Sequence, residues 1–220
     1  MSTSRREAES GRVSSATAPL EGVGAAAGGD PRARLIAAAR HLFAERGFHG
    51  TTADQLIDAA GLTRGALYRD FADKRDLFRA VFETVEEALG TKIIAALRPG
   101  DSLDEQRRAA LRVFLSSARD PEVRRILLLE GPVVLGWEEW REIDGRYSLA
   151  FVSGMLEAEM AAGLRPVQPV RPLAHLTVGA MNEAALAVAF SRDPEVAIEE
   201  FVAGVDSFWR VRKPGGDGSE

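Results

Sequence analysis

The residue types that most often perform catalysis or hold a metal ion are scarce in this chain. Its 220 residues contain no cysteine and three histidines, His41, His49 and His175. The sequence has no His-x-x-x-His pair, no glycine-rich phosphate loop after a strand and no nucleophile elbow. The lack of cysteine excludes disulfides, thiolate metal sites and a cysteine redox sensor. We therefore predict that the protein is not an enzyme and has no metal or cofactor.

A functional pattern lies instead around a glycine that separates two short amphipathic segments. Thr52 and Gln55 form a capping box for the first segment, and Thr63 can cap the second. Ala60-Gly61-Leu62 joins the two, and the glycine permits the tight turn that sets two helices near perpendicular. The major groove of DNA admits one helix, whose N-terminus then reaches base edges. This pattern predicts a helix-turn-helix over about residues 54–73.

About 50 residues resemble the N-terminal domain of TetR-like (tetracycline-repressor family) transcription regulators. The residues that carry the resemblance are Gly47-Phe48, Thr51-Thr52, Leu56-Ile57, the run from Ala60 to Tyr68, Phe71, Lys74 and Leu77-Phe78. In that family the C-terminal domain diverges, binds a small inducer and dimerises. The resemblance therefore implies a ligand-responsive, homodimeric DNA-binding protein, most often a repressor.

The resemblance assigns DNA contacts residue by residue. It implies phosphate contacts for Thr51 and Thr52, and a phosphate near Lys74. Thr63, Arg64, Gly65 and Tyr68 occupy the positions where the family's recognition helix meets bases and backbone. Each assignment has a structural alternative, since the threonines can act as helix caps alone, Tyr68 can pack against Leu77 and Arg64 can be a solvated charge. Capping and phosphate contact are compatible, because helix N-termini attract anions.

Asp70 departs from the family pattern, which often has histidine or another phosphate-compatible residue before Phe71. A carboxylate beside a phosphate repels it. Two hypotheses follow: Asp70 turns away, onto Arg69 or Lys74, or the affinity for DNA is modest.

Charge is distributed unevenly along the sequence. The net charge is −5, yet residues 31–79 have nine Lys/Arg and six Asp/Glu, a net of +3. Residues 80–220 have sixteen against twenty-three, a net of −7. A basic module joined to an acidic body suits local contact with DNA and little non-specific binding by the remainder.

Helical periodicity runs through most of the chain, and strand-like alternation is absent from the sequence. We expect helices at residues 31–46, 52–60, 63–71, 74–98, 102–118, 122–130, 137–162, 171–191 and 194–212. The fold class is predicted to be all-α. The expected organisation is a disordered tail (1–30), a helix-turn-helix domain (31–91), a ligand-binding and dimerisation domain (92–213) and a flexible tail (214–220).

A candidate ligand pocket lies near the mostly apolar run 127–137, which Gly131 and Pro132 interrupt. Trp137, Trp140 and Arg141 share one helical face there and can line a cavity, or can be ordinary core. The full set of candidate pocket residues is Arg112, Glu130, Trp137, Trp140, Arg141, Tyr147, His175 and Asn182.

The last two predicted helices suit an interface between two copies of the chain. The first has many small residues and the second a broad apolar stripe, so a pair from each subunit can form a four-helix interface. The candidate interface residues are Gly179, Ala180, Phe201, Val205, Phe208 and Trp209. Burial within one chain is the alternative.

These patterns together predict a cytoplasmic, homodimeric transcription regulator. It would bind a palindromic operator in double-stranded DNA and be released by a small apolar or aromatic effector. No apolar run approaches the roughly 18 residues of a membrane span. A second hypothesis is a helical interaction protein that no longer binds DNA, which only Asp70 favours.

Overall fold

The computed structural model describes residues 30–209, and every regular element in that part is helical. The elements are α1 (Pro31–Arg46), α2 (Ala53–Ala60), α3 (Arg64–Asp70), α4 (Lys74–Ala96), α5 (Leu103–Ser117), η1 (Val123–Glu130), α6 (Gly131–Leu135), α7 (Trp137–Asp144), η2 (Gly145–Leu149), α8 (Ala150–Ala161), α9 (Val170–Ala189) and α10 (Pro194–Trp209). The predicted all-α class is confirmed. The tails expected at residues 1–30 and 214–220 lie, apart from Asp30, outside the described residues.

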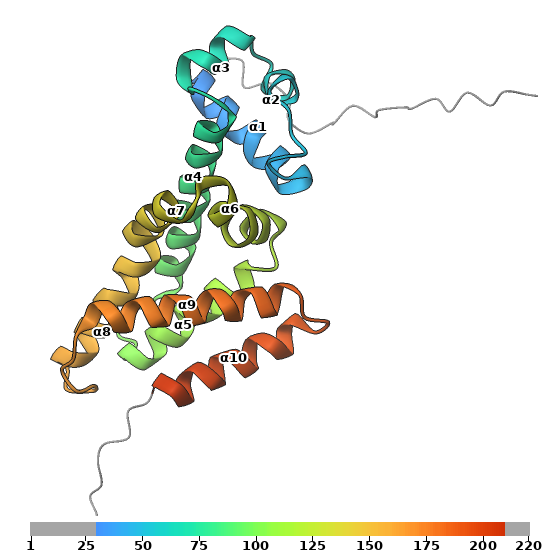
Figure 1. Cartoon of the computed structure of the whole chain (residues 1–220). Coiled ribbons are helices and arrows are strands. Elements are labelled where there is room, and N and C mark those ends of the chain that lie inside the picture. The colour runs from blue at the N-terminus through green and yellow to red at the C-terminus, as the bar shows by residue number, and fades with distance from the viewer. Residues whose placement is uncertain (1–29, 210–220) are drawn as a thin grey trace, which may run out of the picture.

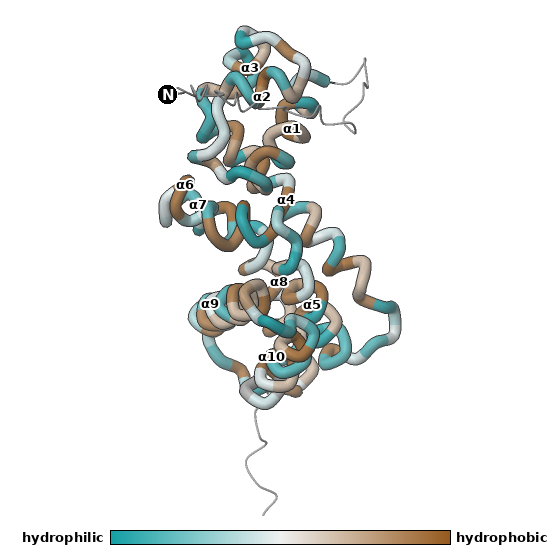
Figure 2. The backbone as a smooth tube through the Cα atoms, turned by 90° about the vertical axis from the view of Figure 1, so that its right-hand side faces the viewer, coloured by the Kyte–Doolittle hydropathy of each residue, from teal (hydrophilic) through white to brown (hydrophobic). Residues whose placement is uncertain are grey.

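The helices form two groups that α4 joins. Figure 1 shows α1, α2 and α3 at one end of the molecule and α5, α9 and α10 near the other, with α4 running between them. Figure 2, turned by 90°, shows the same separation. α4 packs against α1 in the first group and against α5 in the second. A domain boundary after residue 91 would therefore fall within α4, which continues to Ala96.

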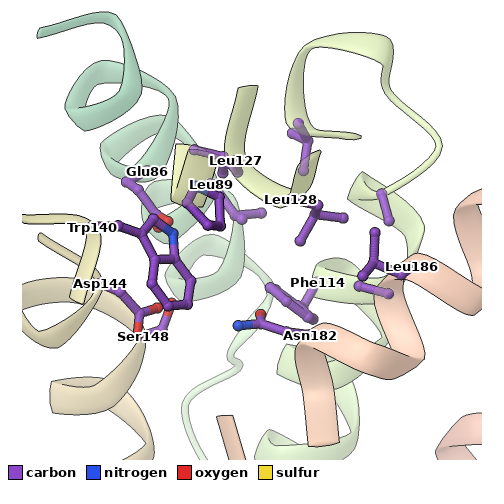
Figure 3. Close-up of a pocket in the computed structure, with 14 residues that line it drawn as sticks. Glu86, Leu89, Phe114, Leu127, Leu128, Trp140, Asp144, Ser148, Asn182 and Leu186 are labelled. Carbon is purple, nitrogen blue, oxygen red and sulfur yellow. The ribbon is translucent and has the colours of Figure 1, made fainter. Parts of the chain in front are cut away.

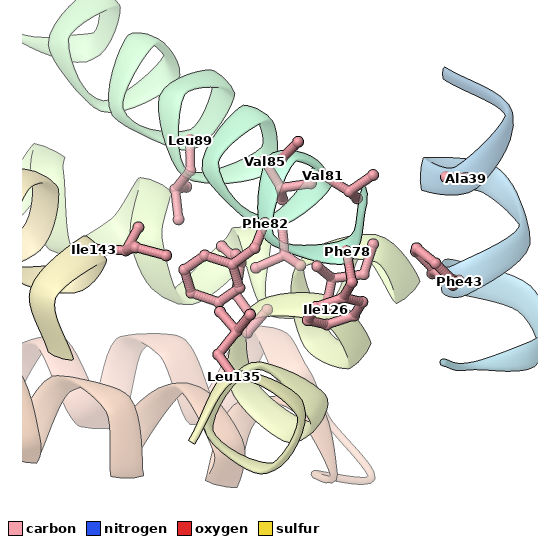
Figure 4. Packing of buried hydrophobic residues seen from close by; sticks show 14 of the residues in the cluster. Ala39, Phe43, Phe78, Val81, Phe82, Val85, Leu89, Ile126, Leu135 and Ile143 are labelled. Carbon is pink, nitrogen blue, oxygen red and sulfur yellow. The ribbon is translucent and has the colours of Figure 1, made fainter. Parts of the chain in front are cut away.

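Both groups share one hydrophobic core. Phe78 and Phe82 of α4 are fully buried, and the Phe78 ring lies 5.3 Å from that of Phe43 in α1. Ile126 of η1 and Leu135 of α6 belong to the same cluster and lie beside Phe78 and Phe82 in Figure 4. Burial of each such side chain stabilises the fold by about 1.5–3 kcal/mol. The first three helices are thus fastened to the C-terminal body through α4.

Caps define the short helices of the first group, as the sequence predicted. The Thr52 hydroxyl accepts from the Gln55 amide at 3.2 Å, while the Gln55 side chain accepts from the Thr52 amide at 2.9 Å. Gly61 ends α2 with φ 62°, a left-handed conformation that glycine adopts without steric cost. Helices of eight and seven residues are unstable alone. Their caps and the shared core are what keep α2 and α3 folded.

The C-terminal body differs from the prediction in two places. The single helix expected over 137–162 is divided into α7, the π-helical turn η2 and α8. The segment Gly131–Leu135, expected to be irregular, forms α6 with Pro132 in its first turn, where a missing N–H is tolerated. Gly131 lets this turn approach α4 closely, since a Cβ there would overlap the Phe82 ring. Local periodicity does not predict such tertiary contacts, because they join segments that are distant in sequence.

The close approach at Gly131 predicts opposite effects for two glycine substitutions. Gly131→Ala forces a methyl group against Phe82 and should lower the free energy of unfolding by about 1–3 kcal/mol. Gly154→Ala is the matched control, because Gly154 lies in α8 with nothing near its Cβ position. It should raise stability by about 0.5–1 kcal/mol through helix propensity. Urea unfolding at one fixed protein concentration measures both, and equal effects of the two variants would contradict the packing.

Candidate functional site

α3 presents an exposed polar face at one end of the molecule (Figure 1). Leu67 is buried and holds the inner side of the helix, whereas Arg64 and Gly65 are exposed and Tyr68 is 48% exposed. The Thr63 hydroxyl caps α3 by accepting from the Ala66 amide at 3.3 Å. The Tyr68 side chain is thus available at the surface.

The two threonines before α2 have different environments. Thr52 is exposed at the N-terminus of α2, where backbone N–H groups and the helix dipole favour an anion. Thr51 is 1% exposed, and its hydroxyl donates to the Gly47 carbonyl oxygen at 2.8 Å. The expectation that the Thr51 side chain contacts a phosphate is therefore wrong, because its hydroxyl is buried and already hydrogen-bonded inside the domain.

Lys74 joins the start of α4 to the loop between α1 and α2. Its Nζ donates to the carbonyl oxygens of Phe48 at 2.7 Å and Thr51 at 2.8 Å, and lies 4.1 Å from the centre of the Phe48 ring. Partial burial lowers the pKa of Lys74. Two of the three N–H donors are used within the domain, so a phosphate would have at most the third. Lys74 is first of all a positioning residue for this loop.

Two ion pairs lie on the exposed side of the first group of helices. Arg64 pairs with Asp54 of α2. Arg69 makes two hydrogen bonds to Asp70, at 3.0 and 2.8 Å, and these lower the pKa of the Asp70 carboxyl. Of the two partners expected for Asp70, Arg69 is therefore the one that binds it, while Lys74 is bonded to the loop between α1 and α2. Exposed pairs are weak because solvent screens them, so phosphates can replace these carboxylates as partners.

Arg34 and Gln55 are positioning residues for the helix-turn-helix. Gln55 completes the capping box of α2, which the sequence indicated. Arg34 of α1 donates to the carbonyl oxygens of Ala60 at 2.6 Å and Gly61 at 3.1 Å, which braces the turn before α3. No sequence signal identifies this role of Arg34, because it depends on how α1 crosses the end of α2.

Polar contacts fasten the first group to the segment η1–α6. The Arg40 Nη2 donates to Glu122 at 2.7 Å, and the Phe48 amide donates to Glu130 Oε2 at 2.7 Å. Arg75 of α4 donates to two backbone carbonyl oxygens of α6 at 3.1 and 2.6 Å. Glu130, expected in the ligand pocket, is thus placed against the Phe48 loop instead. We refer to the contacts Arg40–Glu122 and Phe48–Glu130 as the interdomain latch.

Two adjoining cavities lie in the C-terminal body, with volumes of about 170 and 280 Å³. Five residues line both: Glu86, Leu89, Phe114, Ser148 and Asn182. The first cavity, drawn in Figure 3, is also lined by Leu127 and Leu128 of η1. The walls are mostly apolar with a few converging polar groups, as in small-molecule sites of proteins. The segment that forms the interdomain latch therefore also forms a cavity wall.

The predicted pocket residues divide according to this geometry. Trp140 lines the first cavity, Tyr147 the second and Asn182 both. Arg141 lies behind the wall, 5.1 Å from the Trp140 ring centre and 3.2 Å from Asp144. His175 is partly buried on α9 and lines neither cavity.

Two further predicted pocket residues lie at the surface. Trp137 is 66% exposed, and its ring is tilted by 41° against that of Trp140 with centroids 5.3 Å apart. It lines neither cavity. Arg112 makes a two-point ion pair with Glu199, at 2.9 and 2.7 Å, on an exposed face between α5 and α10. The expectation that Trp137, Arg112 and Glu130 line the ligand pocket is therefore wrong. Each of these side chains contacts another partner outside the two cavities.

The cavity contains two acidic groups that sequence reasoning missed. Glu86 of α4 is 7% exposed, and burial together with the nearby Asp144 raises the pKa of its carboxyl to about 8. Burial also raises the pKa of Asp144, while Arg141 opposes this. A sequence signal exists for Glu86, because it falls among Phe82, Val85 and Leu89 on the buried side of a long helix.

The outer faces of α9 and α10 expose small and apolar residues beside charged ones such as Glu183, Glu195 and Glu199. Gly179 and Ala180 are exposed on α9, beside Leu176, which is 71% exposed. Phe201 and Val205 of α10 are partly buried against the core of their own chain. Phe208 and Trp209, also expected at an interface, have side chains outside the described residues.

Within residues 30–209, no group of three or more histidine or acidic side chains is placed to hold a metal ion. None of the described helices combines the length and apolar character that crossing a membrane requires.

Two family models match the chain. Residues 35–81 match the bacterial regulatory proteins of the tetR family, and residues 105–210 match the tetracyclin repressor-like C-terminal domain. The first match covers the helix-turn-helix, and the second covers most of the C-terminal body, including the cavity walls other than those that α4 provides.

Individual relatives agree with this assignment. The HTH-type transcriptional regulator AcrR of Shigella flexneri is 36% identical over 103 residues, which are 46% of this chain and 47% of AcrR. The HTH-type transcriptional activator FasR of Mycolicibacterium smegmatis is 32% identical over 83 residues, 38% of each chain. The match thus spans less than half the length of either relative.

A solved structure extends the similarity over most of the chain. The crystal structure of a TetR-family transcriptional regulator from Pectobacterium atrosepticum is 30% identical, with a TM-score of 0.69, over 84% of this chain and 95% of that one. The helix-turn-helix braced on α4, the C-terminal helical body and these matches lead to one conclusion: the chain belongs to the tetR family of bacterial regulatory proteins.

Proposed function

We propose that the protein is a homodimeric transcription regulator that binds a palindromic DNA operator and releases it when a small molecule enters the C-terminal cavities. The observation that carries the proposal is the exposed face of α3, held at one end of α4 while the other half of α4 lines the cavities. Release on ligand binding makes the protein a repressor. One relative is an activator, so repression, rather than activation, of transcription is part of the proposal.

Contact with DNA would be made by α3 and the start of α2. Arg64 and Tyr68 project from α3 without core contacts, and arginine is the side chain that most often reads guanine in the major groove. Thr63 and Gly65 let the first turn of α3 approach the bases. Thr52, at the N-terminus of α2, would bind a phosphate. The pair between Arg64 and Asp54 would open on binding, at small cost because both are exposed.

Dimerisation would use the exposed faces of α9 and α10, where small and apolar residues are available. Leu176 of α9 and Phe190, directly after its last residue, are exposed large apolar side chains, and the small residues Gly179 and Ala180 lie between them in sequence. Small side chains let helices approach closely, so the same faces of a second copy can cover them. The two copies of α3 would then enter successive major grooves about 34 Å apart.

The response to a ligand would pass through η1. Leu127 and Leu128 line the first cavity, while Glu122 and Glu130 at the ends of the same segment form the interdomain latch. A ligand that prefers one position of η1 shifts the position of α1 and the helix-turn-helix with it. Such a ligand acts only through its different affinity for the two arrangements.

Base contact by Arg64 predicts a selective loss of DNA affinity. Arg64→Ala should weaken binding to the operator by about 1–3 kcal/mol and relax the preference at one position of each half-site. The operator is first recovered from a random DNA pool, and the affinity is then measured by mobility shift. Arg98→Ala is the matched control, because Arg98 is an exposed arginine beyond the other end of α4. Equal affinities of the two variants would contradict a base contact by Arg64.

The proposed interface predicts that one charge on α9 separates the dimer. Leu176→Asp places a carboxylate in the exposed face of α9, so the protein should sediment as a monomer at micromolar concentration. Operator binding should then fall, because the two half-sites are no longer held together. Leu164→Asp is the control, since Leu164 is also an exposed leucine but lies between α8 and α9. A wild-type protein that sediments as a monomer would refute the dimer outright.

A further inference from the structure

Glu86 places a buried carboxyl group in the walls of both cavities. The residue is 7% exposed, and no hydrogen bond joins its carboxyl to another residue in the described part of the chain. Figure 3 shows its side chain directed toward the space that Trp140, Asp144 and Asn182 surround. A buried polar group without a partner is costly unless something else binds it.

The surroundings of Glu86 favour a positive partner. Asp144 of α7 lies near enough for its charge to act on Glu86, and it disfavours ionisation of the Glu86 carboxyl. Arg141 already pairs with Asp144, and Arg146 of η2 pairs with Glu83 outside the cavity. Neither arginine is paired with Glu86. A cation between the carboxyls would restore the charge balance.

The remaining walls define the rest of the ligand. Around the junction at Glu86, the larger cavity has apolar walls that include Ile93, Phe151 and Met181, and the smaller one has Leu127 and Leu128. The aromatic side chains of Phe114 and Trp140 border the junction, and aromatic faces attract organic cations. A molecule with an apolar body and one basic nitrogen matches both the walls and the junction.

We propose that the two cavities form one effector site for lipophilic amines, with the ammonium group held by Glu86 beside Asp144 and the apolar body in the larger cavity. This inference rests on the proposed function only in calling the ligand an effector. It narrows the expected apolar or aromatic molecule to one that carries a positive charge.

Proton exchange follows from this arrangement. With a pKa of about 8, Glu86 is mostly protonated at pH 7 in the empty site. An ammonium group favours the ionised carboxyl, so binding should release a proton, and affinity should rise between pH 7 and 9 while the amine stays charged. The other titratable or charged groups around the junction are Asp144 and Arg141 of α7, Arg146 and Tyr147 of η2 and His175 of α9. Phe114 of α5 carries no charge.

The test compares phenylbutylamine with phenylbutanol, which has the same apolar body and no charge. Isothermal titration calorimetry of the full chain at pH 7 should show the amine binding at least tenfold more tightly than the alcohol. Repeating the titration in buffers of different ionisation heat should show proton release for the amine alone. Equal affinities, or no binding of the amine at millimolar concentration, would overturn the proposal.

Two variants of the same helix identify the group responsible. Glu86→Gln keeps the shape, so the alcohol should bind as before while the amine loses its tenfold advantage and its proton release. Glu87→Gln is the control for charge on α4: Glu87 is exposed and lines neither cavity, although its carboxyl accepts from the Tyr147 hydroxyl at 3.1 Å, and the amine preference should remain. An amine preference that survives in Glu86→Gln would overturn the assignment.

DNA binding and amine binding can be tested independently. A protein that binds its operator but does not distinguish the amine from the alcohol contradicts the amine site alone. A protein that binds the amine through Glu86 but recovers no DNA from a random pool contradicts the proposed regulator and leaves the amine site standing.

Discussion

The buried aromatic side chains of α4 hold both ends of the molecule to a single core. Phe78 packs against Phe43 of α1, and one turn later Phe82 packs against the turn at Gly131. α2 and α3 are too short to be stable by themselves, so the geometry of the DNA-facing end depends on this core. A change in the packing of α4 or η1 therefore cannot remain local, because close-packed interiors transmit displacement.

The packing of α4 also connects the cavity walls with the first group of helices. Glu86 and Leu89 of α4 form cavity wall about two turns along the helix from Phe78 and Phe82. η1 provides a second route, since its leucines face the cavity while Glu130 holds the amide of Phe48. A ligand at Glu86 would thus touch both α4 and η1, which pack against α1. The helix-turn-helix domain and the C-terminal domain of this chain thus share one continuous hydrophobic core.

Local features of the sequence predicted much of the fold and less of the site. The caps at Thr52, Thr63 and Gly61 were predictable because they depend on residues within one turn. The burial of Thr51, the latch at Glu130 and the exposure of Trp137 were not, because each is decided by a segment distant in sequence. Glu86 is intermediate: its place in an apolar stripe was visible, whereas the absence of a partner required the three-dimensional structure.

Because α4 joins them, the helix-turn-helix and the cavity-bearing body should unfold as one cooperative unit. Urea unfolding observed by two probes tests it most directly. Trp137 and Trp140 report on the body by fluorescence, and amide hydrogen exchange of α1–α3 reports on the other end. The account predicts coincident midpoints for the two probes. Loss of exchange protection in α1–α3 at lower urea, with unchanged tryptophan fluorescence, would contradict it.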